Sequence, residues 1–243
     1  MLSLVIPMYN EEKIITETIQ TVYEYMKNTF NEIGYEVIFV NDGSKDNTFK
    51  VASEAIKSTK NIKVVSYDQN KGKGGAVRTG IFAAKGDYVF YTDCDLAYGL
   101  DVIKQGYDAF TDEKNKDFDI IIGSRRKHKD GYASYTFIRK LASAIFFFVL
   151  KVYGGIKQSD SQSGIKGFRK NTAEKIFGLC EINGWSFDFE ILLISNRLKM
   201  KVFEMPVKII NHRESKINPV KDGIRMLKDI TKIKKRVKKL KID

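Results

Sequence analysis

The sequence predicts an α/β protein with a mostly parallel central sheet, flanked by helices and with further amphipathic helices at its periphery. Short runs of β-branched and aromatic residues alternate with amphipathic stretches through the first half of the chain, which is the pattern of parallel strands with crossover helices. Each apolar run ends in a loop that carries glycine or carboxylate residues. With 243 residues, three prolines and no internal repeat, the chain is expected to form one continuous domain.

Four strands are expected in the first half of the chain, at residues 2–7, 36–40, 62–66 and 88–91. Asn10, Glu11 and Glu12 are expected to cap a helix that runs to about residue 28, because such side chains stabilise the positive end of a helix. A polar turn at residues 41–46 also starts a helix. Parallel strands end at the same edge of a sheet, so the loops that follow them are expected to converge there into one site.

Two carboxylates separated by one residue follow the fourth strand. Asp93 and Asp95 come just after the apolar run that ends at Tyr91. Mg²⁺ is usually bound by one or two carboxylates together with phosphate oxygens and water. The pair is therefore a candidate site for a divalent cation held against a diphosphate. A turn with two solvated acids is the alternative that these residues alone leave open.

A glycine-rich, basic loop occupies residues 70–78 and opens a helix. It matches neither the phosphate loop of nucleoside triphosphatases nor the dinucleotide fingerprint, in which a glycine would replace Val77. What remains is a flexible loop whose backbone amides, with Lys71 and Lys73, are able to approach a nucleotide. An ordinary glycine-rich helix start is the alternative.

Cysteine content and hydropathy favour a cytosolic setting. The chain has two cysteines, which are too few for a disulfide framework. The longest uninterrupted apolar run, residues 144–150, is far shorter than the stretch of about 20 residues that a membrane-spanning helix needs. The N-terminus lacks the basic flank and cleavage site of a signal peptide. We therefore expect a protein of the cytoplasm that does not span a membrane.

The positive charge is concentrated near the C-terminus. Of the net charge of +12, the segment 220–243 carries +7, from ten Lys or Arg and three Asp. We expect residues 1–219 to form the main domain and residues 220–243 a basic amphipathic helix, a candidate membrane foot at residues 232–241. A solvated basic tail is the alternative. Nucleic acid is not an expected partner, because no aromatic residues lie among the tail lysines for base stacking.

Four motifs of the first half carry a resemblance. They are Pro7-x-Tyr9-Asn10-Glu11, Asn41-Asp42-Gly43-Ser44-x-Asp46, Asn70-x-Gly72-Lys73-Gly74-Gly75-Ala76 and Asp93-x-Asp95. In order and approximate spacing they resemble the inverting GT-A glycosyltransferases, whose sheet is Rossmann-like. More narrowly, they are similar to the polyprenyl-phosphate sugar synthases, the group of dolichyl-phosphate mannose synthase and dolichyl-phosphate β-glucosyltransferase.

The second half extends this resemblance to about residue 229. It contains Gly123-Ser124-Arg125, Asp160-Ser161-Gln162-Ser163-Gly164-x-Lys166, Gly184-Trp185-Ser186-Phe187-Asp188-Phe189-Glu190, Phe203-Glu204-Met205-Pro206-Val207 and Arg213-Glu214-Ser215-Lys216. Ile165 departs from the usual phenylalanine. A helix expected over residues 135–153 is apolar around much of its circumference. The resemblance favours a place for it in the membrane interface, and a core helix is the alternative.

The resemblance implies inverting transfer of a hexose from a nucleotide sugar to a polyprenyl phosphate, with Mg²⁺ or Mn²⁺ on Asp93 and Asp95. The residues expected to act in the transfer are Asp95, Arg125, Arg139 and Asp188. Those expected to bind the nucleotide sugar are Pro7, Tyr9, Asn10, Glu11, Asp42, Gly43, Lys71, Gly72, Lys73, Asp93 and Cys94. Those expected to hold the acceptor phosphate are Arg125, Arg139, Ser143, Arg213 and Lys216. The enzyme is expected at the cytoplasmic face of a membrane, peripherally attached.

The donor favoured by the residues is UDP-glucose. Mannose synthases of the group commonly carry a glutamine two residues after the second aspartate, where it joins the metal ligands, and this chain has Ala97 there. A phosphate acceptor is largely a dianion at neutral pH, since its second pKa is about 6, so no strong general base is required. Asp188 is then a secondary candidate, expected to orient the donor sugar, and pairing with an arginine is the alternative. The alternatives are a GDP-mannose-dependent transferase and a transferase that acts on sugar hydroxyls of a surface polysaccharide.

Overall fold

A computed structural model describes residues 1–113, 117–133, 143, 147–211 and 219–240 of the chain, with side chains of the last helix described from Leu227 onward. Its centre is a seven-stranded sheet. The strands are β1 (Leu2–Met8), β2 (Tyr35–Asp42), β3 (Ile62–Tyr67), β4 (Tyr88–Tyr91), β5 (Ile120–Ser124), β6 (Lys166–Arg169) and β7 (Val202–Pro206). Their order across the sheet is β3-β2-β1-β4-β6-β5-β7. Only β6 runs antiparallel to its neighbours among these strands, so the predicted mostly parallel α/β fold is confirmed.

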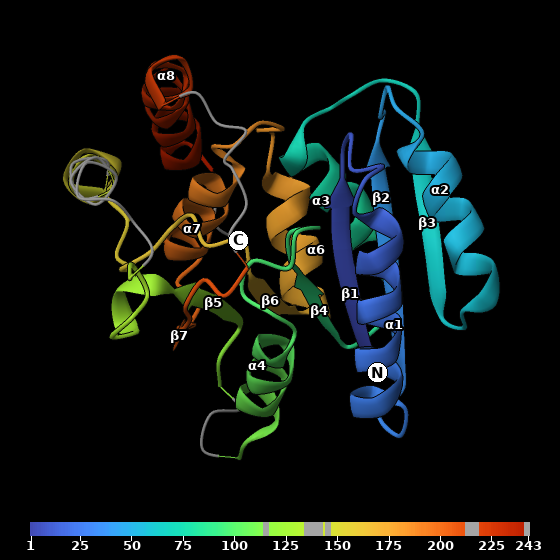
Figure 1. Ribbon diagram of the computed structural model, residues 1–243. Helices are drawn as coiled ribbons and strands as arrows, with labels where there is room; N and C mark the ends of the chain where they lie inside the picture. The colour runs from blue at the N-terminus through green and yellow to red at the C-terminus, as the bar shows by residue number, and fades with distance from the viewer. Residues whose placement is uncertain (114–116, 134–142, 144–146, 212–218, 241–243) are drawn as a thin grey trace.

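Helices cover both faces of the sheet (Figure 1). They are α1 (Ile15–Phe30), α2 (Thr48–Ala55), α3 (Lys73–Ala83), α4 (Asp101–Thr111), α6 (Lys170–Leu179), α7 (Phe187–Arg197) and α8 (Pro219–Lys238). Short helical turns occupy Ile56–Ser58, Arg125–Lys127 and Leu150–Gly154. One buried apolar cluster joins the sheet to α1, α2 and α4, and a second joins its other face to α3, α6, α7 and α8.

The strands follow directly from their side chains. Every residue of β1 except Pro7 is buried, as the continuous apolar run predicts for a strand with helices on both faces. β4 has the predicted bounds, and Val89, Phe90 and Tyr91 are fully buried. Close packing between layers requires glycine in places: a Cβ at Gly80 of α3 would lie 2.2 Å from Val5, so only glycine lets α3 approach β1 this closely.

The predicted cap of the first helix is wrong. α1 begins at Ile15, and its first turn takes no side-chain cap. Asn10 has a left-handed backbone conformation with φ of 53°, and its side-chain oxygen accepts a hydrogen bond of 2.8 Å from the backbone N–H of Lys45. Asn10 therefore ties the loop after β1 to the loop after β2 instead of starting the helix.

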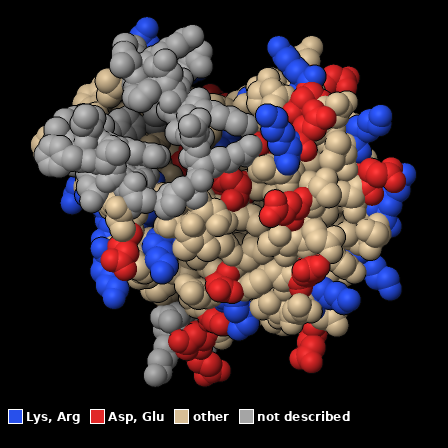
Figure 2. Space-filling view, viewed as in Figure 1, with Lys and Arg blue, Asp and Glu red and all other residues tan. Residues whose placement is uncertain are grey.

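The C-terminal helix α8 is joined to the body of the protein. Ile230, Ile233 and Val237 are buried in the same cluster as α3 and α7. Figure 1 shows α8 beside α7 at one end of the molecule. On the face viewed in Figure 2, acidic and basic side chains are interspersed. The role of α8 as a membrane foot stays a prediction.

No helix in the described part of the chain is both long enough and apolar enough to cross a bilayer.

Candidate active site

The candidate site lies at the carboxyl edge of the sheet, where the loops after β1, β2, β3, β4 and β5 meet (Figure 1). The strand ends in parallel neighbours are in register, with Met8 opposite Asn41 and Asp42 opposite Tyr67. β6 starts at this same edge, because it is antiparallel and Lys166 pairs with Tyr91 at the end of β4. The loop that precedes β6 is thereby brought to the site as well.

Asp42, the last residue of β2, organises the glycine-rich loop. Its Oδ1 accepts hydrogen bonds from the Lys71 backbone N–H at 2.8 Å and from the Tyr67 hydroxyl at 2.7 Å. Its Oδ2 accepts from the Gly72 backbone N–H at 2.9 Å and from the Asn70 side chain at 2.9 Å. A carboxylate has about four acceptor sites, so these donors occupy it fully. Burial and the neighbouring carboxylate also raise the pKa of Tyr67.

Glycine is required at two points of this loop arrangement. Gly43 has φ of +62°, and a Cβ there would lie 2.6 Å from the backbone nitrogen of Asn70. Gly72 has φ of +91°, and a Cβ there would lie 2.6 Å from the carbonyl oxygen of Asn183. Both residues combine a left-handed backbone with close backbone approach, which only glycine accommodates without strain. The loop after β3 is thus held between the end of β2 and the segment before α7.

Lys73, the first residue of α3, points toward the acidic pair. Its ammonium forms an ion pair with Asp93, and it lies 5.4 Å from the centre of the Trp185 ring. Burial by itself lowers the pKa of Lys73, but the carboxylates of Asp93, Asp188 and Asp95 raise it by more, so the group stays cationic. A fixed positive charge therefore stands between the glycine loop and the carboxylates.

Asp93 and Asp95, the predicted cation ligands, follow β4 at this edge of the sheet. Both are partly exposed, and Asp95 is oriented by a hydrogen bond of 3.1 Å that its Oδ1 accepts from the Ala97 backbone N–H. A Cβ at Gly164 would overlap the Asp93 carboxylate, so this side chain fills a cradle that glycine alone leaves open. The described residues contain no cluster of three or more His, Cys, Asp or Glu side chains that could hold a metal, so the cation site at Asp93 and Asp95 stays a prediction.

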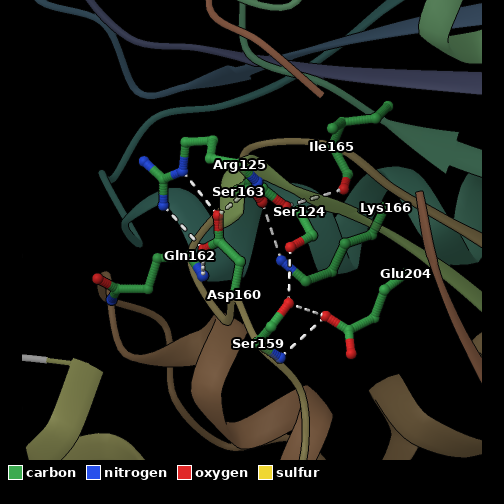
Figure 3. A network of polar contacts seen from close by, with 9 residues as sticks. All are labelled: Ser124, Arg125, Ser159, Asp160, Gln162, Ser163, Ile165, Lys166 and Glu204. Atoms are coloured by element: carbon green, nitrogen blue, oxygen red, sulfur yellow. Dashed lines mark hydrogen bonds and ion pairs between the residues drawn. The ribbon is translucent and has the colours of Figure 1, made fainter. Parts of the chain in front are cut away.

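Arg125, just after β5, is held by Asp160 in a two-pronged contact (Figure 3). Its Nε lies 2.7 Å from Oδ2 and its Nη2 lies 2.8 Å from Oδ1, and its backbone N–H donates to Oδ2 at 3.1 Å. Asp160 is 4% exposed. Burial alone raises the pKa of the Asp160 carboxyl, but Arg125 and two backbone N–H groups lower it below its usual range. This geometry orients the guanidinium that the sequence assigned to the acceptor phosphate.

A second set of polar contacts fixes the loop before β6. The Ser124 hydroxyl lies 2.7 Å from that of Ser159, and Glu204 of β7 accepts hydrogen bonds from both the hydroxyl and the backbone N–H of Ser159 (Figure 3). Lys166 donates to the Ser163 carbonyl at 2.9 Å. The loop is thus tied to β5, β6 and β7, which positions Asp160 and Gly164.

Asp188, at the start of α7, lies in a buried cluster with Lys166 and Tyr91. It forms an ion pair with the Lys166 ammonium and accepts a hydrogen bond of 2.5 Å from the Tyr91 hydroxyl. Lys166 is fully buried and Asp188 is 4% exposed. Burial lowers the pKa of Lys166, and it raises that of Tyr91. The motif around Lys166 was visible in the sequence, but its pairing with Asp188 was not, since the two residues lie on separate elements.

The remaining predicted residues lie in several places. Pro7 is the one residue of β1 that is not buried, while Tyr9 and Glu11 lie in the loop beyond the strand, where the Glu11 backbone N–H donates to Thr48 at 2.7 Å. Cys94 is buried, and its carbonyl accepts a hydrogen bond of 3.0 Å from Thr18. Ser143 hydrogen-bonds with Tyr132. The acceptor candidates outside the described residues are Arg139, Arg213 and Lys216.

Comparison with solved structures shows the type of fold. Glucosyl-3-phosphoglycerate synthase from Mycobacterium tuberculosis, in its complex with Mn²⁺ and UDP-glucose, matches with a TM-score of 0.66 and 20% identity, over 99% of this chain and 80% of that one. Its complex with Mg²⁺ and UDP matches with a TM-score of 0.65 and 18% identity, over 99% and 80% of the two chains. At this identity the likeness shows the GT-A fold.

Sequence comparison gives the family. The model of glycosyl transferase family 2 matches residues 3–177. The dolichyl-phosphate beta-glucosyltransferase of Dictyostelium discoideum is 33% identical over 243 residues, covering 96% of this chain and 73% of the relative. That of Saccharomyces cerevisiae is 30% identical over 247 residues, covering 96% and 74%. With the resemblance confirmed at this level, the chain belongs to glycosyl transferase family 2 and is similar, within it, to the dolichyl-phosphate β-glucosyltransferases.

Proposed function

We propose that this glycosyltransferase moves glucose from UDP-glucose to dolichyl phosphate or a related polyprenyl phosphate, with inversion and with Mg²⁺ or Mn²⁺ bound. The main support for the proposal is that the Lys73 ammonium lies close to the carboxylates of Asp93 and Asp95 at the carboxyl edge of the sheet. Lys73 belongs to the glycine turn, residues 72–75 at the start of α3. Relatives of 30% to 33% identity are named for glucosyl transfer to dolichyl phosphate, which supports the same acceptor class here.

The donor diphosphate fits the edge of the sheet beside α3. The helix begins at Lys73, and its first backbone N–H groups provide the positive end of the helix dipole. Lys71 contributes a second ammonium, placed 4.3 Å from the centre of the Tyr67 ring. Asp42 holds the backbone of this loop, so its own part in donor binding is to shape the loop that approaches the nucleotide.

Asp93 and Asp95 would hold the divalent cation, which when bound supplies Lewis-acid stabilisation of the leaving nucleoside diphosphate. Lys73 adds a permanent positive charge at the same place, since its ammonium is paired with Asp93. The Lys73 ammonium is therefore in place before the leaving group develops its negative charge. Preorganised charge of this kind lowers the barrier because no reorganisation is needed during the reaction.

The acceptor phosphate is proposed to bind on the Arg125 side of the site. The guanidinium of Arg125 is oriented by Asp160, which accepts from its Nε and Nη2, and its positive charge suits a phosphate. Arg139, Arg213 and Lys216 are proposed as further phosphate ligands. The acceptor phosphate is already largely dianionic at neutral pH, with a second pKa of about 6, so the enzyme needs no strong base to activate it.

Asp188 is proposed to orient the donor sugar and to balance local charge. Its Oδ1 already accepts hydrogen bonds from the Lys166 ammonium and from the Tyr91 hydroxyl. The positive charge of Lys73 also interacts with the Asp188 carboxylate. The contacts with Lys166 and Tyr91 fix the position of the Asp188 carboxylate at the start of α7.

Peripheral attachment to the cytoplasmic face of a membrane is proposed from the surface around α8. Large apolar side chains are exposed there: Phe148 at 64%, Val152 at 66% and Leu227 at 43%. Tyr153 joins this segment to α8 by a hydrogen bond of 2.9 Å between its hydroxyl and that of Thr231. Exposed apolar residues beside a basic helix are the combination that binds anionic lipid surfaces.

A donor panel with extraction of the product tests the proposal. UDP- and GDP-sugars, each radiolabelled, are incubated with a short polyprenyl phosphate, with and without Mg²⁺ or Mn²⁺. Label from UDP-glucose is expected in the organic phase and only with the cation. Label from GDP-mannose alone would overturn the donor assignment, and label retained in a membrane-derived polysaccharide would overturn the acceptor.

A pair of aspartate variants tests the cation site. Asp95→Ala is expected to abolish cation-dependent turnover, while Asp108→Ala, which removes an exposed carboxylate paired with Lys104, leaves it unchanged. Folding is checked by thermal unfolding of both variants. Undiminished turnover in a folded Asp95→Ala protein would remove the metal assignment.

A further inference from the structure

We propose that Arg236 of the C-terminal helix is a positioning residue for the donor site. It acts through the buried carboxylate of Glu190, which holds the loop 181–183, and this loop in turn seats the glycine turn at the start of α3. The inference rests on the donor-binding role proposed above for that turn. The last helix of the chain would thus help to position the residues at the start of α3 that are proposed to bind the nucleotide sugar.

The first link joins α8 to the body of the protein. Arg236 donates from Nη2 to Oε1 of Glu190 at 2.5 Å and from Nη1 to the carbonyl oxygen of Leu179, the last residue of α6, at 2.7 Å. Its Nη1 also lies 3.5 Å from a carboxylate oxygen of Glu181. The guanidinium therefore bridges α6, α7 and the loop between them, and its planar fork is the reason that one residue reaches all three.

The second link is the other oxygen of Glu190. Its side chain is fully buried, and Oε2 accepts hydrogen bonds from the backbone N–H groups of Glu181 at 3.1 Å and Ile182 at 2.8 Å. One carboxylate thus binds Arg236 with one oxygen and the loop with the other. Without the guanidinium, a buried anion would lack its counter-charge, and it would be stabilised by moving toward water and releasing the two amides.

The third link joins the loop to the glycine turn. The carbonyl oxygen of Asn183 accepts hydrogen bonds from the backbone N–H groups of Gly74 at 2.7 Å and Gly75 at 3.4 Å. The Asn183 side chain accepts from Nη1 of Arg78 at 3.0 Å. A Cβ at Gly72 would lie 2.6 Å from the same Asn183 carbonyl. The first turn of α3 is therefore seated directly on the loop that Glu190 holds.

The fourth link joins the glycine turn to the predicted cation ligand Asp93 through Lys73. Lys73 lies between Gly72 and Gly74, and its ammonium is the group paired with Asp93. A displacement of the loop 181–183 moves the backbone that carries Lys73, because the flanking Gly74 N–H donates to the Asn183 carbonyl. The binding of the donor then depends on whether α8 is docked. The contact of the Ser186 hydroxyl with Asp229 of α8, at 2.7 Å, supports the same docked position.

A different arginine provides a matched control. Arg197 at the end of α7 also reaches the segment just after α8, donating from Nη2 to the carbonyl oxygen of Leu240 at 3.4 Å, but it has no contact with the loop 181–183 among the hydrogen bonds described. If Arg236 served only to anchor α8, then Arg236→Met and Arg197→Met would act alike, apart from their effect on stability. If it positions the donor turn, only Arg236→Met disturbs residues 72–78.

The experiment uses the full chain and two readouts. Hydrogen–deuterium exchange without any ligand reports the Gly74 and Gly75 amides, and steady-state kinetics with UDP-glucose and a short polyprenyl phosphate report donor KM and kcat. For Arg236→Met we expect faster exchange at these amides and a rise of about tenfold in donor KM, the size of one lost hydrogen bond to a charged group, with acceptor KM nearly unchanged. Arg236→Lys keeps the charge and the fold, and it is expected to show an intermediate change in both.

The outcomes separate this inference from the proposed function. Unchanged exchange at Gly74 and Gly75 in Arg236→Met or Arg236→Lys would overturn the inference, whatever the donor proves to be. An equal change in Arg197→Met would also overturn it. If UDP-glucose is not the donor, the exchange experiment still stands by itself, and the kinetic experiment is repeated with the nucleotide sugar that the panel identifies.

Discussion

Replacement of Lys166 by methionine provides a strong test of the buried cluster behind the site. Methionine fills nearly the same volume but removes the ammonium that is paired with Asp188. The carboxylate, 4% exposed, would keep the Tyr91 hydroxyl at 2.5 Å as its described hydrogen-bond donor on Oδ1. Breaking a buried ion pair from one side costs about 3–5 kcal/mol. For a chain of this length each kcal/mol lowers the melting temperature by about 2–4 °C, so a decrease of roughly 10 °C is expected.

The assay is thermal unfolding at neutral pH of the single variant and of the double variant Lys166→Met with Asp188→Asn. The double variant removes the buried charge as well, so it is expected to recover most of the lost stability, because a neutral pair of similar volume pays no penalty for an unbalanced ion. Its activity with UDP-glucose is expected to remain low, since Asp188 is proposed to orient the sugar. A single variant that melts within about 2 °C of the wild type would refute the reasoning, because the ion pair would then contribute nothing measurable.

Three further predictions concern the site. Gly164→Ala is expected to lower cation-dependent turnover at least about tenfold by displacing Asp93, whereas Gly178→Ala, at an open position, leaves it unchanged. Gly72→Ala is expected to raise donor KM with little effect on acceptor KM, because its φ of +91° and the Asn183 carbonyl both oppose a Cβ. The pKa of Asp160 is lowered from 3.8, so its stabilising effect is complete above that pH and is lost as pH falls through the lower folded value.

The contradicting results of these three are equally specific. A Gly164→Ala enzyme with normal affinity for Mn²⁺, measured by calorimetry, would show that Asp93 is not confined there. An increase in acceptor KM alone for Gly72→Ala would move the glycine turn to the acceptor side. For Asp160, unfolding curves of the wild type and of Asp160→Asn are compared from pH 7 to pH 2. The wild type is expected to lose its advantage only below pH 3.8, and a loss above pH 5 would contradict the assignment.

The sequence predicts the parallel part of the fold well, because that part is built from local patterns. A short apolar run such as residues 88–91, followed by a polar loop that contains glycine or carboxylate residues, predicts a buried strand of a parallel sheet. β6 is different: Lys166–Arg169 contains two cations and a glycine, which is not a strand pattern. It forms a strand because Gly167 lets the backbone lie against the Phe90 ring of β4, a contact that exists only in the folded chain.

In the site, the sequence predicted which loops come together but not which charged side chains pair. The approach of Asp42, Gly72 and Asp93 follows from the rule that parallel strands end together, so their meeting was predictable. The partners of the charged groups were not. That Arg125 binds Asp160 and that Glu190 binds Arg236 depends on side chains from distant segments, and charge alone does not select a partner among 30 acidic and 42 basic residues.

The reversed direction of β6 also decides which segment of the second half of the chain lies at the site. A strand that enters at the carboxyl edge puts the residues before it into the site and sends those after it, from Lys170 onward, to the opposite edge. Under the proposed function, changes of length ahead of Ser159 would act first on the Arg125 side of the site, because this segment leads into the loop that holds Asp160. The same loop also carries Gly164, which lies against Asp93, so the junction between β4 and β6 is where the two sides of the site constrain each other.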